Sequence, residues 1–188
     1  MNTIEAIKTR KSVRSFKAQP VEREKIQAVV EAGAMAAGTP MAGKRRFIVI
    51  TNAELLTMMS DATKRVMATL PNPMFQKLGA NPDYCPTYKA PVAVVIVTDN
   101  ATDDNSRAML TANAACAGEN MLISATSLGL GSCYLVSPTM AFFDPAFCTA
   151  VGMPEGAHAE AVIVMGYTDD DKPHAPRANM DEMITFVE

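Results

Sequence analysis

Apolar residues recur every three or four positions in several stretches of the chain, which is the spacing of an amphipathic helix. The stripe is clearest over residues 21–37 and longest over residues 106–128, which are so rich in alanine and other apolar residues that we expect a central helix there. Shorter helices are predicted at residues 3–9, 54–62 and 142–151. The chain is therefore expected to contain several helices that bury one face.

A run of apolar residues without alternation occurs at residues 92–97. Such a run is typical of a strand that is buried on both faces, and it requires a layer of structure on each side. Further strands are predicted at residues 47–51, 132–136 and 161–167, while residues 12–16 alternate as a short strand or extended arm. Strands that alternate with helices and need cover on both faces predict a three-layer α/β/α or α+β fold.

The segment at residues 66–87 fits neither pattern. It carries four prolines, Pro71, Pro73, Pro82 and Pro86. Proline removes a backbone donor and ends or kinks a helix. We expect this segment to be broken and partly mobile.

Length and composition limit the class of protein. The chain has 188 residues, of which 48% are hydrophobic and 20% charged, so residues 1–188 are expected to form a single domain with its own core. The net charge of −3 is too mild for a molecule that binds polyanions over its whole surface. The longest apolar run, residues 90–97, is much shorter than the ~20 residues that span a bilayer. We expect a soluble protein with no membrane partner.

The four cysteines, Cys85, Cys116, Cys133 and Cys148, are scattered and form no CxxC pair. The first residues of the chain also lack the cationic start and apolar run of a secretory signal. We therefore expect reduced, mostly buried thiols rather than a zinc site, and a cytoplasmic protein.

The densest group of charges lies near the N-terminus and has five cations within ten residues: Lys8, Arg10, Lys11, Arg14 and Lys17. Together with the hydroxyl of Ser12, these groups are good donors to phosphate oxygens. The cluster is a candidate phosphate site, with a solvated charged face as the alternative. A second basic group at residues 44–46 adds no nucleic-acid motif, and the chain has few aromatic residues to stack on bases, so no nucleic-acid partner is expected.

No set of side chains in the sequence forms a recognisable acid, base or nucleophile. Residues 129–132, Gly-Leu-Gly-Ser, follow a predicted helix and precede a strand, the reverse of the order in a dinucleotide-binding loop. His158 and His174 are the only histidines, and the acidic run at residues 169–171 is interpreted as a solvated turn. If the chain is an enzyme, a cofactor is expected to carry the chemistry.

The residues 6–16, AIKTRKSVRSF, resemble the opening signature of the nitroreductase family of FMN-dependent oxidoreductases, where a basic-basic-Ser triplet is followed by another basic residue. Residues 120–134 are similar to the central helix and glycine turn of that family. Residues 151–156, the strand at 162–167 and Arg177 resemble its C-terminal strand and phosphate-binding tail. The resemblance implies an α+β, three-layer α/β/α sandwich with a mixed, mostly antiparallel central sheet flanked by helices.

The resemblance also implies a homodimer with two FMN molecules in grooves at the subunit interface. Arg10, Lys11 and Ser12 would hold the phosphate and ribityl chain, and Arg177 would close over the phosphate. Arg14 would lie toward the pyrimidine end of the ring, where a cation favours the anionic reduced flavin.

The other implied flavin contacts come from a loop of the second subunit and from the backbone of a strand, at Thr39, Met41 and Gly43 and at Tyr134, Leu135 and Val136 respectively. Members of the family usually carry an Asn and then Gln-Pro-Trp in that loop. This chain reads Met-Ala-Gly-Lys-Arg at residues 41–45, so the polar side chains that would bond to the flavin ring are absent, and so is the tryptophan.

The activity implied by the resemblance is transfer of electrons from NADH or NADPH through FMN to a nitroaromatic, quinone or similar flat acceptor, by a ping-pong sequence. No protein acid or base is required, because hydride moves directly to and from the flavin ring. The altered loop leaves an alternative: a low-turnover flavin-binding or regulatory protein of the same fold.

Overall fold

Four antiparallel strands form the centre of the molecule. A computed structural model describes residues 1–39, 45–173 and 183–187 of the chain. The strands lie side by side in the order β1-β2-β4-β3, and each neighbouring pair is antiparallel. Their bounds are β1 (Arg45–Ile50), β2 (Val92–Asp99), β3 (Gly131–Leu135) and β4 (Ala157–Gly166). β2 and β4 are therefore central, whereas β1 and β3 are the edge strands.

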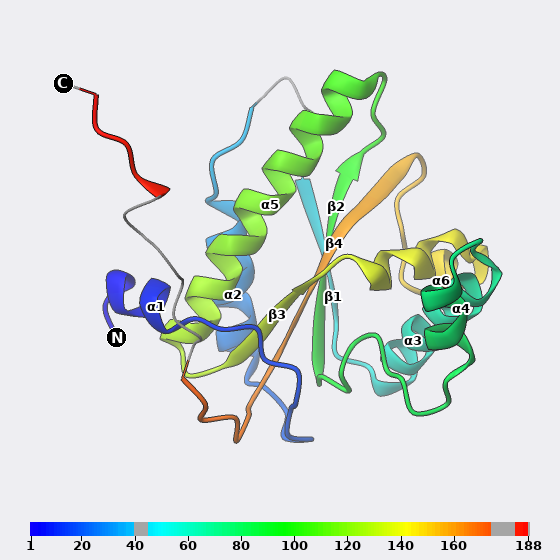
Figure 1. Cartoon of the computed structure of the whole chain (residues 1–188), viewed down its shortest axis with the longest axis horizontal. Helices are drawn as coiled ribbons and strands as arrows, with labels where there is room; N and C mark the ends of the chain where they lie inside the picture. The colour runs from blue at the N-terminus through cyan, green and yellow to red at the C-terminus, as the bar shows by residue number, and fades with distance from the viewer. Residues whose placement is uncertain (40–44, 174–182, 188) are drawn as a thin grey trace.

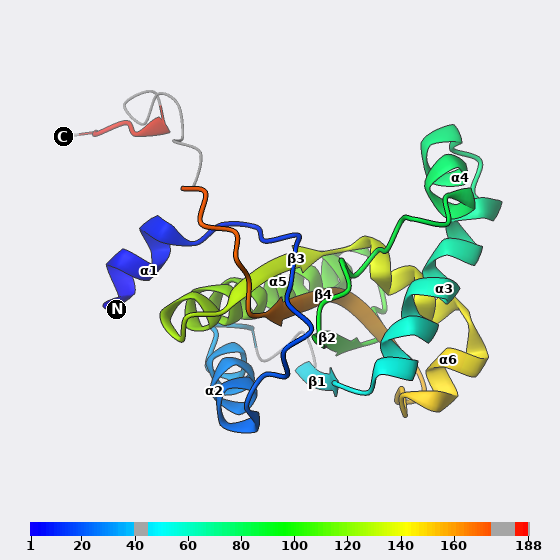
Figure 2. The same ribbon diagram turned by 90° about the horizontal axis from the view of Figure 1, so that it is seen from below.

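Helices cover both faces of this sheet, as Figure 1 and Figure 2 show. One face carries two helices, α2 (Arg23–Ala34) and α5 (Asp104–Ser127), with α1 (Thr3–Thr9) packed on α5. The other face carries α3 (Ala53–Thr69), α4 (Pro73–Ala80), the 3₁₀ helix η2 (Ser137–Phe143) and α6 (Pro145–Ala150). The three-layer α+β fold is therefore confirmed. In the part of the chain that the structure describes, every helix is too short or too polar to span a bilayer.

The side chains of β2 alternate between two hydrophobic cores. Val94 and Ile96 pack with α2 and α5, while Val95 and Val97 pack with the helices of the other face. All four are completely buried, because successive side chains of a strand point to opposite faces and both faces are covered. The prediction of a strand buried on both faces is confirmed.

The expectation of a broken segment at residues 66–87 was wrong for its first part. α3 continues to Thr69 and α4 begins at Pro73. The prolines interrupt neither helix because Pro71 follows the end of α3 and Pro73 is the first residue of α4, where a missing N–H costs nothing. Asn72 caps α4, since its side chain accepts a hydrogen bond from the Met74 N–H at 3.0 Å.

Two smaller expectations also need correction. The helix predicted at residues 142–151 is divided between η2 and α6, because Asp144 caps the new helix by accepting a hydrogen bond from the Ala146 N–H at 2.9 Å. All four cysteines are free, as expected, but only Cys133 is buried. Cys116 is exposed because it lies on the solvent side of α5.

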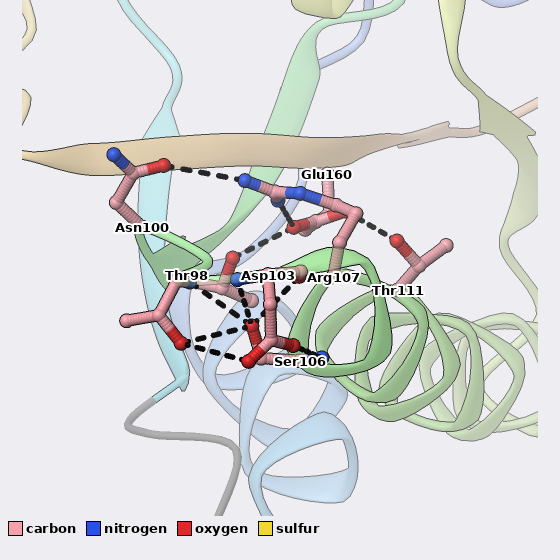
Figure 3. A network of polar contacts seen from close by, with 8 residues as sticks. Thr98, Asn100, Asp103, Ser106, Arg107, Thr111 and Glu160 are labelled. Atoms are coloured by element: carbon pink, nitrogen blue, oxygen red, sulfur yellow. Dashed lines mark hydrogen bonds and ion pairs between the residues drawn. The ribbon is translucent and has the colours of Figure 1, made fainter.

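A polar network joins the start of α5 to the sheet (Figure 3). The Glu160 carboxylate of β4 accepts hydrogen bonds from Arg107 at 2.6 Å, Thr98 at 2.7 Å and Thr111 at 3.0 Å, and its side chain is only 4% exposed. Asp103 caps α5 nearby, where its side chain accepts a hydrogen bond from the Ser106 N–H at 2.7 Å. The network fixes the position of α5 along β2 and β4.

We expect Glu160→Ala to lower the free energy of unfolding by about 2–3 kcal/mol, because it leaves Arg107 and two hydroxyls without their acceptor. Arg46→Gln is the matched control. It breaks an ion pair with Asp99 of similar length, 2.8 Å, in which both side chains are about two-fifths exposed, and such pairs contribute ~1 kcal/mol or less. Urea unfolding of both variants checks this; equal losses would show that the network does not anchor α5.

Candidate functional site

The basic segment after α1 lies along the free edge of β3. The Val13 N–H donates to the Ser132 carbonyl at 2.9 Å, and Ser12 and Ser132 form a parallel bridge. This bridge adds a parallel element to the otherwise antiparallel sheet, so the expectation of a mixed, mostly antiparallel sheet is confirmed. The extended arm predicted from the alternation at residues 12–16 therefore contacts the edge of the sheet at Ser12 without forming a strand.

Arg10 lies between this edge and α5. Its guanidinium pairs with the Glu119 carboxylate of α5 at 3.1 Å; the Arg10 side chain is 14% exposed and the Glu119 side chain 51%. A half-exposed pair of this kind contributes ~1 kcal/mol or less. An anion that binds Arg10 more tightly than the Glu119 carboxylate does can therefore replace it.

Lys11 is bound to the segment that follows β4. Its ammonium pairs with the Asp170 carboxylate at 3.0 Å and donates to the main-chain oxygens of Asp170 and Lys172. The Lys11 ammonium holds the pKa of the Asp170 carboxyl below its usual range. The acidic run at residues 169–171 is therefore not simply a solvated turn.

Ser12 and Arg14 line a hollow of about 530 Å³ between residues 12–17 and 169–172. Both are exposed, and within the described ranges no ion pair is recorded for Arg14. Burial raises the pKa of the Cys133 thiol, while the cations of Arg14 and Arg10 and the hydroxyl of Ser12 act in the opposite direction. Arg10, Ser12 and Arg14 therefore all lie near the Cys133 position of β3.

The three strand residues predicted to lie behind a flavin differ in what their side chains can reach. The Tyr134 ring packs against α5 so closely that a Cβ on Gly118 would lie 2.5 Å from it. Leu135 is buried in the opposite core, and Val136 is exposed just beyond the end of β3. Val136 is the most exposed of the three, Tyr134 is half-buried, and a contact at Leu135 is through the backbone.

Thr39 lies at the root of the predicted flavin-contacting loop. Its N–H donates to the Asn113 side-chain oxygen of α5 at 3.1 Å, which ties the start of the loop to that helix. The other loop residues of the prediction, Met41 and Gly43, and the tail residue Arg177 lie outside the described residues.

The family model described as Nitroreductase family matches residues 7–167 of the chain. The chain belongs to the nitroreductase family. A relative from Archaeoglobus fulgidus, named as a candidate NADH dehydrogenase/NAD(P)H nitroreductase, is 27% identical over 172 residues, which cover 90% of this chain and 87% of the relative.

Two solved nitroreductases with bound FMN are similar to this chain over the whole of both molecules. The structure from Bacteroides fragilis has a TM-score of 0.89 at 27% identity, and the structure from Desulfitobacterium hafniense has a TM-score of 0.83 at 25% identity; each comparison covers 100% of both chains. The resemblance noted from residues 6–16 and 120–134 is thereby confirmed at the level of the family and the fold.

Arg45 occupies the place where the nitroreductase resemblance expects tryptophan. Its guanidinium donates to the main-chain oxygens of Ala36 at 2.6 Å, Ala37 at 3.0 Å and Asn113 at 2.9 Å. It therefore fastens the end of α2 and the root of the loop to α5. In the sequence this arginine was only part of a basic triplet, and nothing local indicated its partners.

The site also contains residues that the sequence did not indicate. Glu119 and Asn113 are polar positions of α5 with no motif around them, and their roles depend on which segments pack beside the helix. Asp170 did have a signal, because an acidic run near the end of a chain that opens with a basic cluster favours an ion pair between the two.

A second cavity of about 610 Å³ lies between α3 and the chain that leads into β2, and Ser60, Cys85 and Thr87 are among the residues that line it. The Cys85 sulfur lies 3.6 Å from the Ser60 hydroxyl and 3.4 Å from the Thr87 hydroxyl, and it accepts the Lys89 N–H at 3.3 Å. Burial raises the pKa of the Cys85 thiol, but these hydrogen bonds outweigh burial and leave the pKa below its ordinary value.

We expect Cys85 to be alkylated by iodoacetamide at lower pH than Cys148. Both thiols are half-buried, but burial and the Asp144 carboxylate raise the pKa of Cys148. Because the thiolate is the reactive form, the alkylation rate of Cys85 should reach half its maximum at the lower pH. Mass spectrometry of the labelled peptides over a pH series measures both rates.

Thr87→Val should move the Cys85 midpoint to higher pH by removing one donor to the sulfur. Thr57→Val is the control, because Thr57 lines the same cavity but its hydroxyl bonds to the Ala53 carbonyl of its own helix. A Cys85 midpoint at or above that of Cys148 would contradict the assigned hydrogen bonds.

Proposed function

We propose that this chain is an FMN-dependent oxidoreductase that takes electrons from NADH or NADPH and passes them to a nitroaromatic, quinone or similar flat acceptor by a ping-pong sequence. The observation that supports this most strongly is the basic segment held along the edge of β3, with Ser12 and Arg14 beside a hollow. The FMN-containing nitroreductases of Bacteroides fragilis and Desulfitobacterium hafniense share the fold over their whole length.

The donors of this segment fit an FMN phosphate. Ser12 offers a hydroxyl, and Arg14 offers an exposed guanidinium. Arg10 would exchange its half-exposed carboxylate partner for the phosphate, because a guanidinium forms strong, paired hydrogen bonds with phosphate oxygens. The described residues thus supply the type of donor set that the phosphate needs.

FMN, when bound, supplies the hydride chemistry itself. The work of the chain is to bind the group and to set its electrostatic surroundings. The Arg14 cation would stabilise negative charge near the pyrimidine end of the ring, the backbone from Tyr134 to Val136 would support the ring, and Arg177 would close over the phosphate.

We propose a homodimer, because large apolar side chains remain exposed on α1, beyond β3 and in the C-terminal segment: Ile4, Ile7, Val136, Phe143, Met183, Ile184, Phe186 and Val187. Ile4 and Ile7 lie three residues apart on one helix, and Met183, Ile184, Phe186 and Val187 lie within one short segment. Neighbouring exposed apolar groups of this kind mark an interaction surface. Loop residues Thr39, Met41 and Gly43 of each subunit would complete the FMN groove of the other. We also propose a cytoplasmic protein, which the four free thiols support. Residues 1–188 would form a single domain.

The purified protein incubated with FMN should retain the flavin through gel filtration and show its visible absorption bands. Under anaerobic conditions NADH or NADPH should bleach these bands, and a quinone or nitroaromatic should restore them without further donor. Bound flavin that neither nicotinamide reduces would instead support the alternative, a low-turnover flavin-binding or regulatory protein. A protein that stays colourless after incubation with FMN would contradict both.

Arg10→Ala should raise the dissociation constant for FMN about tenfold or more, the effect of losing one charge-assisted hydrogen bond. Affinity for riboflavin, which lacks the phosphate, should change little. Arg46→Gln, which alters an exposed arginine on β1, is the control for loss of a positive charge. Isothermal titration with the two flavins makes the comparison, and an Arg10→Ala protein that holds FMN as tightly as the parent would refute the phosphate assignment.

A further inference from the structure

All three N–H donors of the Lys11 ammonium are used in contacts within the structure. A lysine ammonium has three N–H donors and no acceptor. In this structure it faces three oxygens of one segment: the Asp170 carboxylate at 3.0 Å, the Asp170 main-chain oxygen at 2.7 Å and the main-chain oxygen of Lys172. A phosphate could gain a hydrogen bond from Lys11 only at the expense of one of these.

Other bonds join the same two segments. The Lys17 N–H donates to the Tyr167 carbonyl at 2.8 Å, and the Thr168 hydroxyl donates to the Ser15 carbonyl at 2.8 Å. The segment after β4 also folds on itself, because the Lys172 N–H donates to the Asp170 carboxylate at 3.2 Å. Residues 167–172 are thus held along residues 11–17, and Lys11 contributes the bonds farthest from β4.

The hollow that contains Ser12 and Arg14 is formed by this pairing. One wall consists of residues 12–17 and the other of residues 169–172. A change in the position of the second segment therefore changes the space beside Ser12 and Arg14. Lys11 determines that position without lining the hollow itself.

We infer that Lys11 is a positioning residue in this chain, which holds residues 168–172 against residues 12–17 and leaves the FMN phosphate to Arg10 and Ser12. The inference rests on the proposed function and departs from the role that the family resemblance implies for Lys11. The two roles of Lys11, phosphate ligand and positioning residue, predict opposite changes in FMN affinity when the charge of Asp170 is removed.

Asp170→Asn separates the two roles. Asparagine keeps the shape of the side chain and an oxygen that can still accept the Lys172 N–H, but it removes the charge that holds Lys11. If Lys11 were a phosphate ligand, the variant would free it and tighten FMN binding. Because Lys11 positions the segment, we expect FMN to bind about tenfold more weakly, with a smaller change for riboflavin. A general loss of structure would weaken both flavins equally.

Asp169→Asn is the matched control. Asp169 pairs with Lys17 at 2.5 Å, but its side chain is 84% exposed, so neutralising it should leave the position of the segment unchanged. Because Asp169 also lines the hollow, it serves as the control for hydrogen exchange and not for flavin binding. Hydrogen exchange followed by mass spectrometry, on protein without added flavin, should show faster exchange at residues 168–172 in Asp170→Asn and not in Asp169→Asn.

The exchange measurement does not depend on flavin binding, so it separates the two possible failures. A parent protein that binds no FMN but shows the expected exchange difference would refute the proposed function and keep the role of Lys11 in holding the segment. Tighter or unchanged FMN binding in Asp170→Asn, or equal exchange in both variants, would overturn the inference.

Discussion

The burial of β2 and β4 on both faces is the constraint on which the rest of the structure depends. Over most of their length the side chains of these strands alternate between two cores and are buried, so neither strand can carry a charged or mobile group there. Helices must cover both faces, and α5 can approach closely because half of its buried residues are alanine or glycine, with Gly118 against the Tyr134 ring. The carboxylate of Glu160 at the margin of the core is tolerated because three donors satisfy it.

The donors of the candidate site consequently lie at a sheet edge, along β3. An edge strand has unpaired backbone groups on one side, and Ser12 and Val13 bond to them. Gly131 makes this approach possible, since a Cβ there would lie 3.0 Å from both the Val13 and Thr168 side chains. The glycine turn thus matters here for packing: it lets the basic segment and the segment after β4 reach the same end of β3.

Much of this arrangement could be predicted because its signals are local. The apolar run at residues 92–97 specified a doubly buried strand, and the basic residues from Arg10 to Arg14 lie together in space because they lie together in the chain. The partner of Lys11 could not be predicted in the same way. Lys11 and Asp170 are 159 residues apart, and only the antiparallel return of β4 to the end of β3 brings them together.

The role of Arg45 could not be predicted for the same reason, because it depends on contacts that form only in the folded chain. The carbonyls of Ala36 and Ala37, just beyond the end of α2, have no partner within the helix, and a cation is favourable at the negative end of a helix dipole. Arg45 satisfies both carbonyls and also reaches the main-chain oxygen of Asn113 in α5, so it fixes the loop root by hydrogen bonds. If this loop contacts FMN as proposed, the absence of Gln-Pro-Trp takes away contacts to the flavin ring, while the bonds of Arg45 still hold the start of the loop. We therefore expect an FMN groove whose loop is anchored at its start but makes fewer polar contacts with the flavin ring. Such a groove would change the environment of the flavin rather than abolish flavin binding.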